Sequence, residues 1–415
     1  MTEVLYLVHR LPFPPNKGDK IRSYHLLRYM AARYEVHLGC FVDDADDEKY
    51  VGEIGKYCKT TCIRKLNRFS STIKSAKGLV NGNALSLPYY FDRTLATWID
   101  DVLATSNVSA IVAFSSPMGQ YVLGPQYKNI RRIMDFVDID SDKWRQYAKR
   151  SHGPMKWIYS REAALLEDFE RNVTEAFDSV VFVSENETST FSSQWPDTKM
   201  KHFTVCNGVA TDYFDPALEF ISPFNSDAVP IVFTGLMDYW PNVDAVGWFA
   251  REVLSEVRNK IPKLQFWIVG ASPTNEILKL DSDPGIVVTG KVPDVRPYLK
   301  HAAAVIAPLK IARGVQNKVL EGLAMGRPVI CTPQAAAGLS DKAEAPIRVA
   351  SSQSEFVDSV VDIVRTGVDS ELSNRSRSYV LDNYNWERNL SLFSDLLMAS
   401  PTRSRGLKRE PFCFG

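Results

Sequence analysis

Short runs of apolar and β-branched residues alternate along the chain with segments of helical length. In the first half, these runs are VLYLVH (4–9), EVHLGCFV (35–42), SAIVAFSS (109–116), RRIMDFVDI (131–139) and SVVFVS (179–184). In the second half, they are PIVFTG (230–235), LQFWIVG (264–270), GIVVTG (285–290), AAVIAPL (303–309) and RPVICT (327–332). Strands this apolar are typical of parallel sheets covered on both faces. The pattern therefore predicts an α/β fold with two Rossmann-like, doubly wound domains.

The two halves open alike, each with a strand, a proline-bearing loop and an amphipathic helix. Between them, residues 205–230 are rich in turn-forming residues, and we expect the linker at Asp215–Asp227. The predicted domains are thus 1–215 and 216–383. Neither half has the G-x-G-x-x-G pattern after a strand, which weakens the case for a dinucleotide cofactor. Ligands of such sheets bind beyond the carboxyl ends of the strands, so the loops there are the candidate site.

Composition adds mainly exclusions. The chain has 415 residues, of which 45% are hydrophobic and 24% charged, and its formal net charge is zero. No global field therefore draws it to nucleic acid or to a membrane. Cys58 and Cys62 form an isolated C-x(3)-C pair, which does not suffice for zinc. The N-terminal segment lacks the features of a signal peptide and no apolar run is long enough to span a bilayer, so we expect a cytoplasmic protein.

The stretch PLKIARGVQNKVLEGLAMGRPVI (308–330) reads as a loop that leads into a helix. On a helical wheel, one face carries Val319, Leu320, Leu323 and Ala324, and the other carries Lys318, Glu321, Gly322 and Met325. Lys318 falls in the first turn, where a cation opposes the helix dipole at a cost of about 0.3–1 kcal/mol. Two interpretations remain open: an exposed Lys318–Glu321 pair, or an anion site.

The anion-site interpretation combines several groups of the same stretch. Arg313, Lys318, the flexible Gly314 and the free amides of the helix start could together hold a diphosphate. Glu321, one turn further along, could accept hydrogen bonds from the two hydroxyls of a ribose. This combination describes a site for a nucleoside diphosphate.

The same stretch resembles the C-terminal donor site of retaining glycosyltransferases of family 4, which have the GT-B fold of two Rossmann-like domains facing across a cleft. Further segments fit that family in order: VCNGVATDYF (205–214), IVFTGLMDYWPNVDAVGWF (231–249), FWIVG (266–270), VVTGKVPDVRPYL (287–299) and YNWE (384–387). In the first half, LPFPPNKGDKIRSYHLLRYMA (11–31) and DFVDIDSDKW (135–144) resemble sugar transferases associated with PEP-CTERM/exosortase exopolysaccharide loci. The resemblance spans about residues 3–398.

The resemblance implies transfer of a sugar, with retention, from a nucleotide diphosphate sugar to an acceptor hydroxyl in exopolysaccharide biosynthesis, without a metal or other cofactor. It makes residues 1–215 the acceptor-side domain and 216–383 the donor domain, with a helix at 384–399 crossing back and a disordered tail at 400–415. Glu321 would bind the ribose and Lys318 the diphosphate. The expected donor-site residues are Gly18, Gly235, Arg313, Gly314, Gln316, Asn317, Lys318 and Glu321. Asp138 joins Lys318 and Glu321 as a catalytic candidate, because many relatives have a histidine near that position.

The chain departs from the family pattern at two places. Many members have a glutamate eight residues before Glu321, where this chain has Arg313. Many also have an arginine and a lysine after the first strand of the second domain, and GLMDYWPN (235–242) has neither. We hypothesise that Arg313 and Lys318 supply this charge. A nucleotide-sugar epimerase of the same fold and a non-catalytic nucleotide-sugar-binding or membrane-scaffold protein remain as alternatives.

Two other groups of residues allow more than one interpretation. The carboxylates Asp135, Asp138, Asp140 and Asp142 could hold a cation or cap the next helix. The stretches 54–91 and 143–161 contain basic residues and no acidic ones. In 143–161, aromatic residues lie between the basic ones. These stretches are either solvated helix faces or a surface for a lipid-linked acceptor at the inner membrane; we expect a glycan or lipid-linked acceptor and no nucleic acid. The acceptor or membrane side is predicted to include Lys20, Arg22, Lys74, Lys77, Arg145, Lys149 and Arg150.

Overall fold

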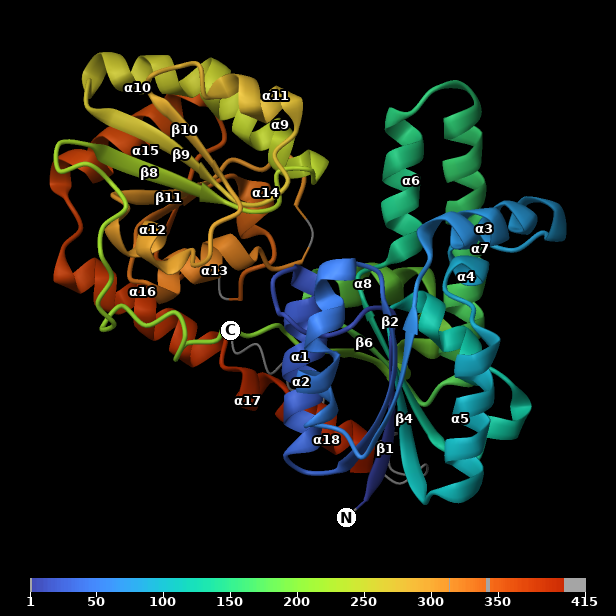
Figure 1. The fold of residues 1–415 in the computed structure, drawn as a ribbon. Coiled ribbons are helices and arrows are strands. Elements are labelled where there is room, and N and C mark those ends of the chain that lie inside the picture. The colour runs from blue at the N-terminus through green and yellow to red at the C-terminus, as the bar shows by residue number, and fades with distance from the viewer. Residues whose placement is uncertain (1, 313, 341–343, 399–415) are drawn as a thin grey trace. The chain divides into compact units, whose positions relative to one another are not determined.

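The computed structural model describes the chain except for residues 1, 313, 341–343 and 399–415 (Figure 1). For residues 68, 70, 76, 77, 80 and 81, it describes only the backbone. The described chain forms two compact units, residues 2–206 with 390–398 and residues 207–389. The boundary thus falls at 206/207, earlier than the expected 215/216, and the expected linker Asp215–Asp227 belongs to the second unit. The expected disordered tail, 400–415, lies outside the described residues.

The first unit is built on a sheet of seven parallel strands in the order β3-β2-β1-β4-β5-β6-β7. The strands are β1 (Glu3–Val8), β2 (Glu35–Val42), β3 (Thr60–Lys65), β4 (Val108–Phe114), β5 (Arg131–Val137), β6 (Ser179–Phe182) and β7 (His202–Thr204). In β1, every residue from Val4 to Val8 is buried, as expected of a central strand covered on both faces.

Helices cover both faces of this sheet (Figure 1). The helices of this unit are α1 (Gly18–Ala31), α2 (Val51–Gly55), α3 (Arg68–Asn81), α4 (Ser86–Tyr89), α5 (Arg93–Thr105), α6 (Asp140–Arg150), α7 (Gly153–Ala176), α8 (Glu185–Gln194) and α18 (Ser391–Met398), of which α6 pairs with α7 in a hairpin that projects from the sheet. The expected single helix at 384–399 is instead two helices, because α17 (Trp386–Asn389) ends in the second unit and α18 lies in the first. The hydroxyl of Tyr34 lies 2.9 Å from that of Ser394, which joins α18 to the first unit.

The second unit is built on six parallel strands in the order β10-β9-β8-β11-β12-β13. The strands are β8 (Val229–Thr234), β9 (Leu264–Val269), β10 (Ile286–Gly290), β11 (Ala304–Ala307), β12 (Val329–Cys331) and β13 (Ile347–Val349). Its other helices are α9 (Trp240–Trp248), α10 (Leu254–Lys260), α11 (Asn275–Leu280), α12 (Arg296–His301), α13 (Asn317–Ala324), α14 (Pro333–Ala336), α15 (Gln353–Thr366) and α16 (Ser370–Asn383).

Both sheets reverse their strand order next to their first strand. In the first unit, β1 lies between β2 and β4, and in the second unit, β8 lies between β9 and β11. At such switch points, loops leave the sheet in opposite directions and open a crevice at the carboxyl ends of the strands. The predicted fold class of two parallel α/β units is confirmed. The topology also points to the loops after β1, β4, β8 and β11 as the places to look for a site.

Candidate functional site

In the second unit, α13 begins just beyond the carboxyl end of β11, at the switch point. Its apolar face packs on the sheet as predicted, with Val319, Leu320 and Leu323 fully buried. Gly322 does not belong to the polar face, because a Cβ there would lie 3.1 Å from a methyl group of both Val305 and Val329. Met325, also expected on the polar face, is fully buried as well. Of the four residues predicted for the polar face, only Lys318 and Glu321 are not buried.

Lys318 lies in the first turn of α13, as predicted, and is half-buried. Its Nζ donates a hydrogen bond to Oδ1 of Asn242, 3.1 Å away, and lies 4.8 Å from the centre of the Phe233 ring. Burial lowers the pKa of Lys318 to about 8, against the effect of the Glu321 carboxylate. An ammonium group has three N–H donors, and only one has an acceptor among the described residues. The side chain is thus held in place with hydrogen-bonding capacity left over.

Glu321 follows one turn later and is half-buried too. Its carboxylate has no hydrogen bond or ion pair with any residue that the structure describes, so the Lys318–Glu321 surface pair, one of the two interpretations left open, does not form. Burial raises the pKa of Glu321 to about 7, against the charge of Lys318. Neither side chain is sealed from water, because both are only half-buried. Two neighbouring groups of opposite charge are therefore open to hydrogen bonds from water or from a ligand at this switch point.

Two glycines lie in the loops next to Asn242, the residue that binds Lys318. Gly235 follows β8 with a φ of 156°, and a Cβ there would lie 2.7 Å from Nδ2 of Asn242. Gly270 follows β9, and a Cβ there would lie only 1.7 Å from the carbonyl oxygen of Gly235. Only glycine allows these two loops to approach so closely. The predicted donor-site residue Gly235 is therefore next to Asn242 and Lys318, whereas Gly270 was not recognised from the sequence.

The other predicted donor residues of this unit lie in the loop before α13. Gly314 has a φ of 55°, and Gln316 and Asn317 occupy the start of α13. The first backbone N–H groups of a helix have no partner within the helix and attract anions. Arg313, also assigned to the donor site, lies outside the described residues. The predicted donor-site residues of this unit thus lie in the segments that follow the carboxyl ends of the central strands β8 and β11, at the switch point. They are Gly235, Gly314, Gln316, Asn317, Lys318 and Glu321.

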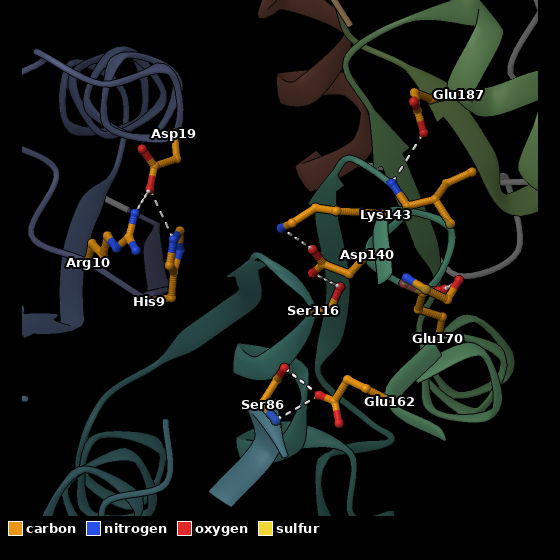
Figure 2. A network of polar contacts seen from close by, with 12 residues as sticks. His9, Arg10, Asp19, Ser86, Ser116, Asp140, Lys143, Glu162, Glu170 and Glu187 are labelled. Carbon is orange, nitrogen blue, oxygen red and sulfur yellow. Dashed lines mark hydrogen bonds and ion pairs between the residues drawn. The ribbon is translucent and has the colours of Figure 1, made fainter. Parts of the chain in front are cut away.

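The first unit has a polar network at its own switch point (Figure 2). Nε2 of His9, which follows β1, lies 3.1 Å from Oδ2 of Asp19, and Arg10 donates to the same oxygen at 2.9 Å. Arg10 also forms an ion pair with Asp43 at 2.9 Å. Burial alone would raise the pKa of Asp19, but the bonds from His9 and Arg10 hold it well below its usual range. The first turn of α1 therefore carries an ionised carboxylate, Asp19, next to Gly18, the residue that the sequence had singled out and that begins this helix.

The predicted carboxylates of β5 and the segment after it do not form one cluster, because each binds a different partner. Asp140 accepts hydrogen bonds from Ser116 Oγ at 2.8 Å and Lys143 Nζ at 3.1 Å (Figure 2). Asp135 is fully buried against Arg22 at 2.8 Å, and Asp142 contacts Arg145 at 3.4 Å. Among the described residues, no group of three or more His, Cys, Asp or Glu side chains could hold a metal ion.

Asp138, the catalytic candidate of this unit, comes directly after β5 and Val137, whose φ is 68°. The nearby Asp140 and, to a lesser degree, Asp138 raise the pKa of Lys143. Deeper in the same region, Glu170 accepts bonds from both the amide and the hydroxyl of Ser141, and burial raises its pKa to about 8. Glu170 was not recognised from the sequence, because its partner comes from another helix.

Two residues assigned to the acceptor or membrane side prove to be buried. Lys20 pairs with Asp47 and Arg22 with Asp135, and both basic side chains are at most 1% exposed. They neutralise buried carboxylates and cannot contribute to a surface, so these two predictions were wrong.

The other basic residues assigned to the acceptor or membrane side differ in exposure and in their partners. Lys74, Lys149 and Arg150 are exposed, whereas Arg145 is bonded to Glu167 at 2.8 Å. The side chain of Lys77 lies outside the described part of the structure.

Comparisons with known proteins agree with this architecture. Residues 228–366 match the family model described as Glycosyl transferases group 1. No curated protein sequence matches the chain. Among solved structures, sucrose-phosphate synthase from Thermosynechococcus elongatus is similar at a TM-score of 0.68 and 15% identity, over 95% of this chain and 98% of that one. A glycosyltransferase from Rickettsia africae ESF-5 has a TM-score of 0.65 and 16% identity, over 96% and 99% of the two chains. Anabaena Alr3699/HepE, in complex with UDP, has a TM-score of 0.66 and 10% identity, over 96% and 99%.

These matches concern the fold of the whole chain and the family of one segment. The structural neighbours share the fold over nearly the whole chain, so the fold is that of the GT-B glycosyltransferases. The matched segment, residues 228–366, contains β8, β11 and α13 and therefore the whole switch point of the second unit. The chain thus has the GT-B fold, and its residues 228–366 match the model of group 1 glycosyl transferases.

Proposed function

We propose that this protein transfers a sugar from a nucleotide diphosphate sugar to an acceptor hydroxyl, with retention of configuration, in exopolysaccharide biosynthesis. The observation that carries the proposal is a pair of oppositely charged side chains at the switch point of the second unit. Lys318 has one hydrogen bond to the described residues and Glu321 has none, so both can bind a ligand. Their partners would be the diphosphate and the ribose hydroxyls of the donor.

Each end of such a donor finds a matching group. Hydroxyl donors of the ribose would supply the hydrogen bonds that Glu321 lacks, and would favour its ionised form. The diphosphate would accept from Lys318 and from the amides at the start of α13. When the sugar bond breaks, negative charge develops on the departing diphosphate, and these same groups stabilise it. In the first unit, Asp138 would orient a sugar hydroxyl or stabilise developing positive charge on the sugar ring.

Support for the identity of the donor comes from a structural neighbour. Structures of Anabaena HepE are described in complex with UDP and with UDP-glucose. A UDP-sugar is therefore the first donor to test here. We propose further that no metal is required, since the charge of the leaving group can be met by Lys318 and the helix start.

The acceptor is proposed to be a glycan or a lipid-linked sugar at a membrane surface. No helix of the described chain is long and apolar enough to cross a bilayer, so contact would be peripheral. The candidate surface, called the α3–α7 surface below, consists of Phe69, Ile73 and Leu79 on α3 with Met155 and Trp157 on α7. Phe69 is 77% and Trp157 61% exposed, which is unusual for such large apolar side chains.

The two helices of this surface are joined directly. Arg161 of α7 donates to the carbonyl oxygens of Gly78, at 2.8 Å, and Asn83, at 3.2 Å. Lys74 on α3 and Lys156 on α7 are exposed basic side chains, and so are Lys149 and Arg150 at the end of α6, which precedes α7 in the chain. Apolar side chains flanked by cations are typical of proteins that bind anionic lipid surfaces. The other aromatics of the basic stretch, Trp144, Tyr147 and Tyr159, pack on one another between α6 and α7 instead.

The deciding experiment is a product assay with UDP-, GDP-, ADP- and dTDP-sugars, with and without a membrane extract as the acceptor source. The proposal expects release of nucleoside diphosphate that depends on the extract, and NMR of the product should show the anomeric configuration of the donor. Conversion of the donor sugar without acceptor would instead indicate an epimerase. Donor binding without turnover would indicate a non-catalytic binding protein. Inverted configuration would contradict the retaining mechanism.

A further inference from the structure

We propose that Asn242 is a positioning residue, which holds the ammonium of Lys318 against the donor diphosphate without neutralising its charge. The proposal rests on the proposed function, since it assigns a role within the same donor site. Asn242 belongs to α9, and nothing in the sequence patterns or in the comparisons singles it out.

Asn242 is anchored at both ends of its amide. It is 5% exposed, and its Nδ2 donates to the carbonyl oxygen of Leu236 at 2.8 Å. Its Oδ1 accepts from Nζ of Lys318 at 3.1 Å. A carbonyl can only accept and an amino group can only donate, so the two bonds fix the orientation of the amide. The side chain therefore links α9, the loop after β8 and α13 in one defined arrangement.

The neutrality of this partner is the central point. An aspartate of the same shape at position 242 would form an ion pair with Lys318 and cancel most of the charge that an anion requires. The amide provides a hydrogen bond and no charge, and the face of the Phe233 ring provides a second neutral contact at 4.8 Å. Among the described residues, no carboxylate lies within ion-pair distance of Lys318. The cation is thus fixed in space but left unpaired, as binding of a diphosphate demands.

The arrangement also explains why the loop after β8 needs no cation of its own. Gly235 lies directly against Nδ2 of Asn242, so the lysine that Asn242 holds is delivered to the end of β8 from α13. Lys318, which is 76 residues from Asn242 in sequence, thereby places its positive charge next to the loop that begins at Gly235.

The test compares three substitutions by isothermal titration with UDP, or with whichever nucleoside diphosphate stabilises the wild-type protein most. Asn242→Asp keeps the shape and adds a charge, Asn242→Leu removes the hydrogen bond, and Lys318→Gln removes the cation. Asn259→Asp, on the exposed surface of α10, is the control for added negative charge. Loss of one charge-assisted hydrogen bond corresponds to about tenfold to a hundredfold in affinity. We expect both substitutions at Asn242 to weaken binding by at least about tenfold, and the control to leave it unchanged.

A second readout does not depend on nucleotide. The pKa of Lys318, measured by NMR of its side chain in the free protein, should rise in Asn242→Asp because a carboxylate stabilises the ammonium. Unfolding curves verify that each variant is folded. If Lys318→Gln loses affinity while both Asn242 variants bind like the wild type and leave the pKa of Lys318 unchanged, the role of Asn242 is refuted and the donor site stands. If the wild type binds no nucleoside diphosphate, or Lys318→Gln has no effect, the donor site itself is refuted.

Discussion

The affinity for a nucleoside diphosphate should fall steeply between pH 7 and pH 9. Burial lowers the pKa of Lys318 to about 8, so the group changes charge between pH 7 and pH 9. The anion binds the charged form, and its contribution is therefore present below pH 8 and lost above it. With a pKa near 8, about 90% of Lys318 is charged at pH 7 and about 10% at pH 9. The affinity that depends on this charge should drop about tenfold over those two units.

The assay is isothermal titration at constant ionic strength in half-unit steps of pH. Lys318→Arg is the matched control, because a guanidinium stays charged throughout this range. Any ionisation of the nucleotide affects both proteins equally and cancels in the ratio of their affinities. The affinity of the wild type relative to that of Lys318→Arg should fall about tenfold between pH 7 and pH 9. Parallel curves for the two proteins would show that the charge of Lys318 is not what binds the nucleotide.

Three further predictions concern other parts of the molecule. Glu321→Gln should weaken binding of a ribonucleoside diphosphate about tenfold and reduce its preference over the 2′-deoxy form, as titration of both nucleotides would measure. Phe69→Ser combined with Trp157→Ser should reduce co-sedimentation with vesicles that contain anionic phosphatidylglycerol, because both large side chains are exposed. Arg22→Met should destabilise the first unit by about 3–5 kcal/mol in urea, because it leaves the carboxylate of Asp135 buried without its partner.

Two of these predictions have a matched control variant, and the third has a refuting outcome in the wild type. For the vesicles, Ile221→Ser removes a side chain that is 93% exposed in the second unit and should not affect sedimentation. An equal loss in that variant, or binding that is insensitive to salt, would argue against the α3–α7 surface. For the buried pair, Arg171→Met removes an exposed partner of Glu175 and should cost less than about 1 kcal/mol. Equal affinities for the ribo and deoxy forms in the wild type would refute the role of Glu321.

The sequence predicted the central strands of both sheets and the edge strand β10, but it missed β3, β7 and β13. Strands β1, β8 and β11 are buried on both faces, so their residues are apolar without interruption and easy to recognise. Strand β3, TTCIRK, lies at an edge and is largely exposed, and therefore shows no such run. β7 and β13 contain three residues each, too few for any periodic pattern.

The site was predictable where it depends on local sequence. Lys318 and Glu321 lie on one short helix, so their spacing alone placed them together. Asn242 is 76 residues from Lys318, and only the packing of α9 against the loop after β8 brings the two side chains into contact. The same limit explains the error at Arg22, whose buried partner Asp135 is 113 residues away. A charge in the sequence does not reveal whether its partner is solvent or a distant carboxylate.

The central claim is that the switch point of the second unit binds the nucleoside diphosphate of a sugar donor. A crystal structure of the protein with the nucleoside diphosphate that stabilises it most tests this claim directly. The account predicts a phosphate oxygen within hydrogen-bonding distance of Nζ of Lys318 and the ribose hydroxyls on the carboxylate of Glu321. A nucleotide bound elsewhere, or one that places its base rather than its diphosphate at Lys318, would contradict it.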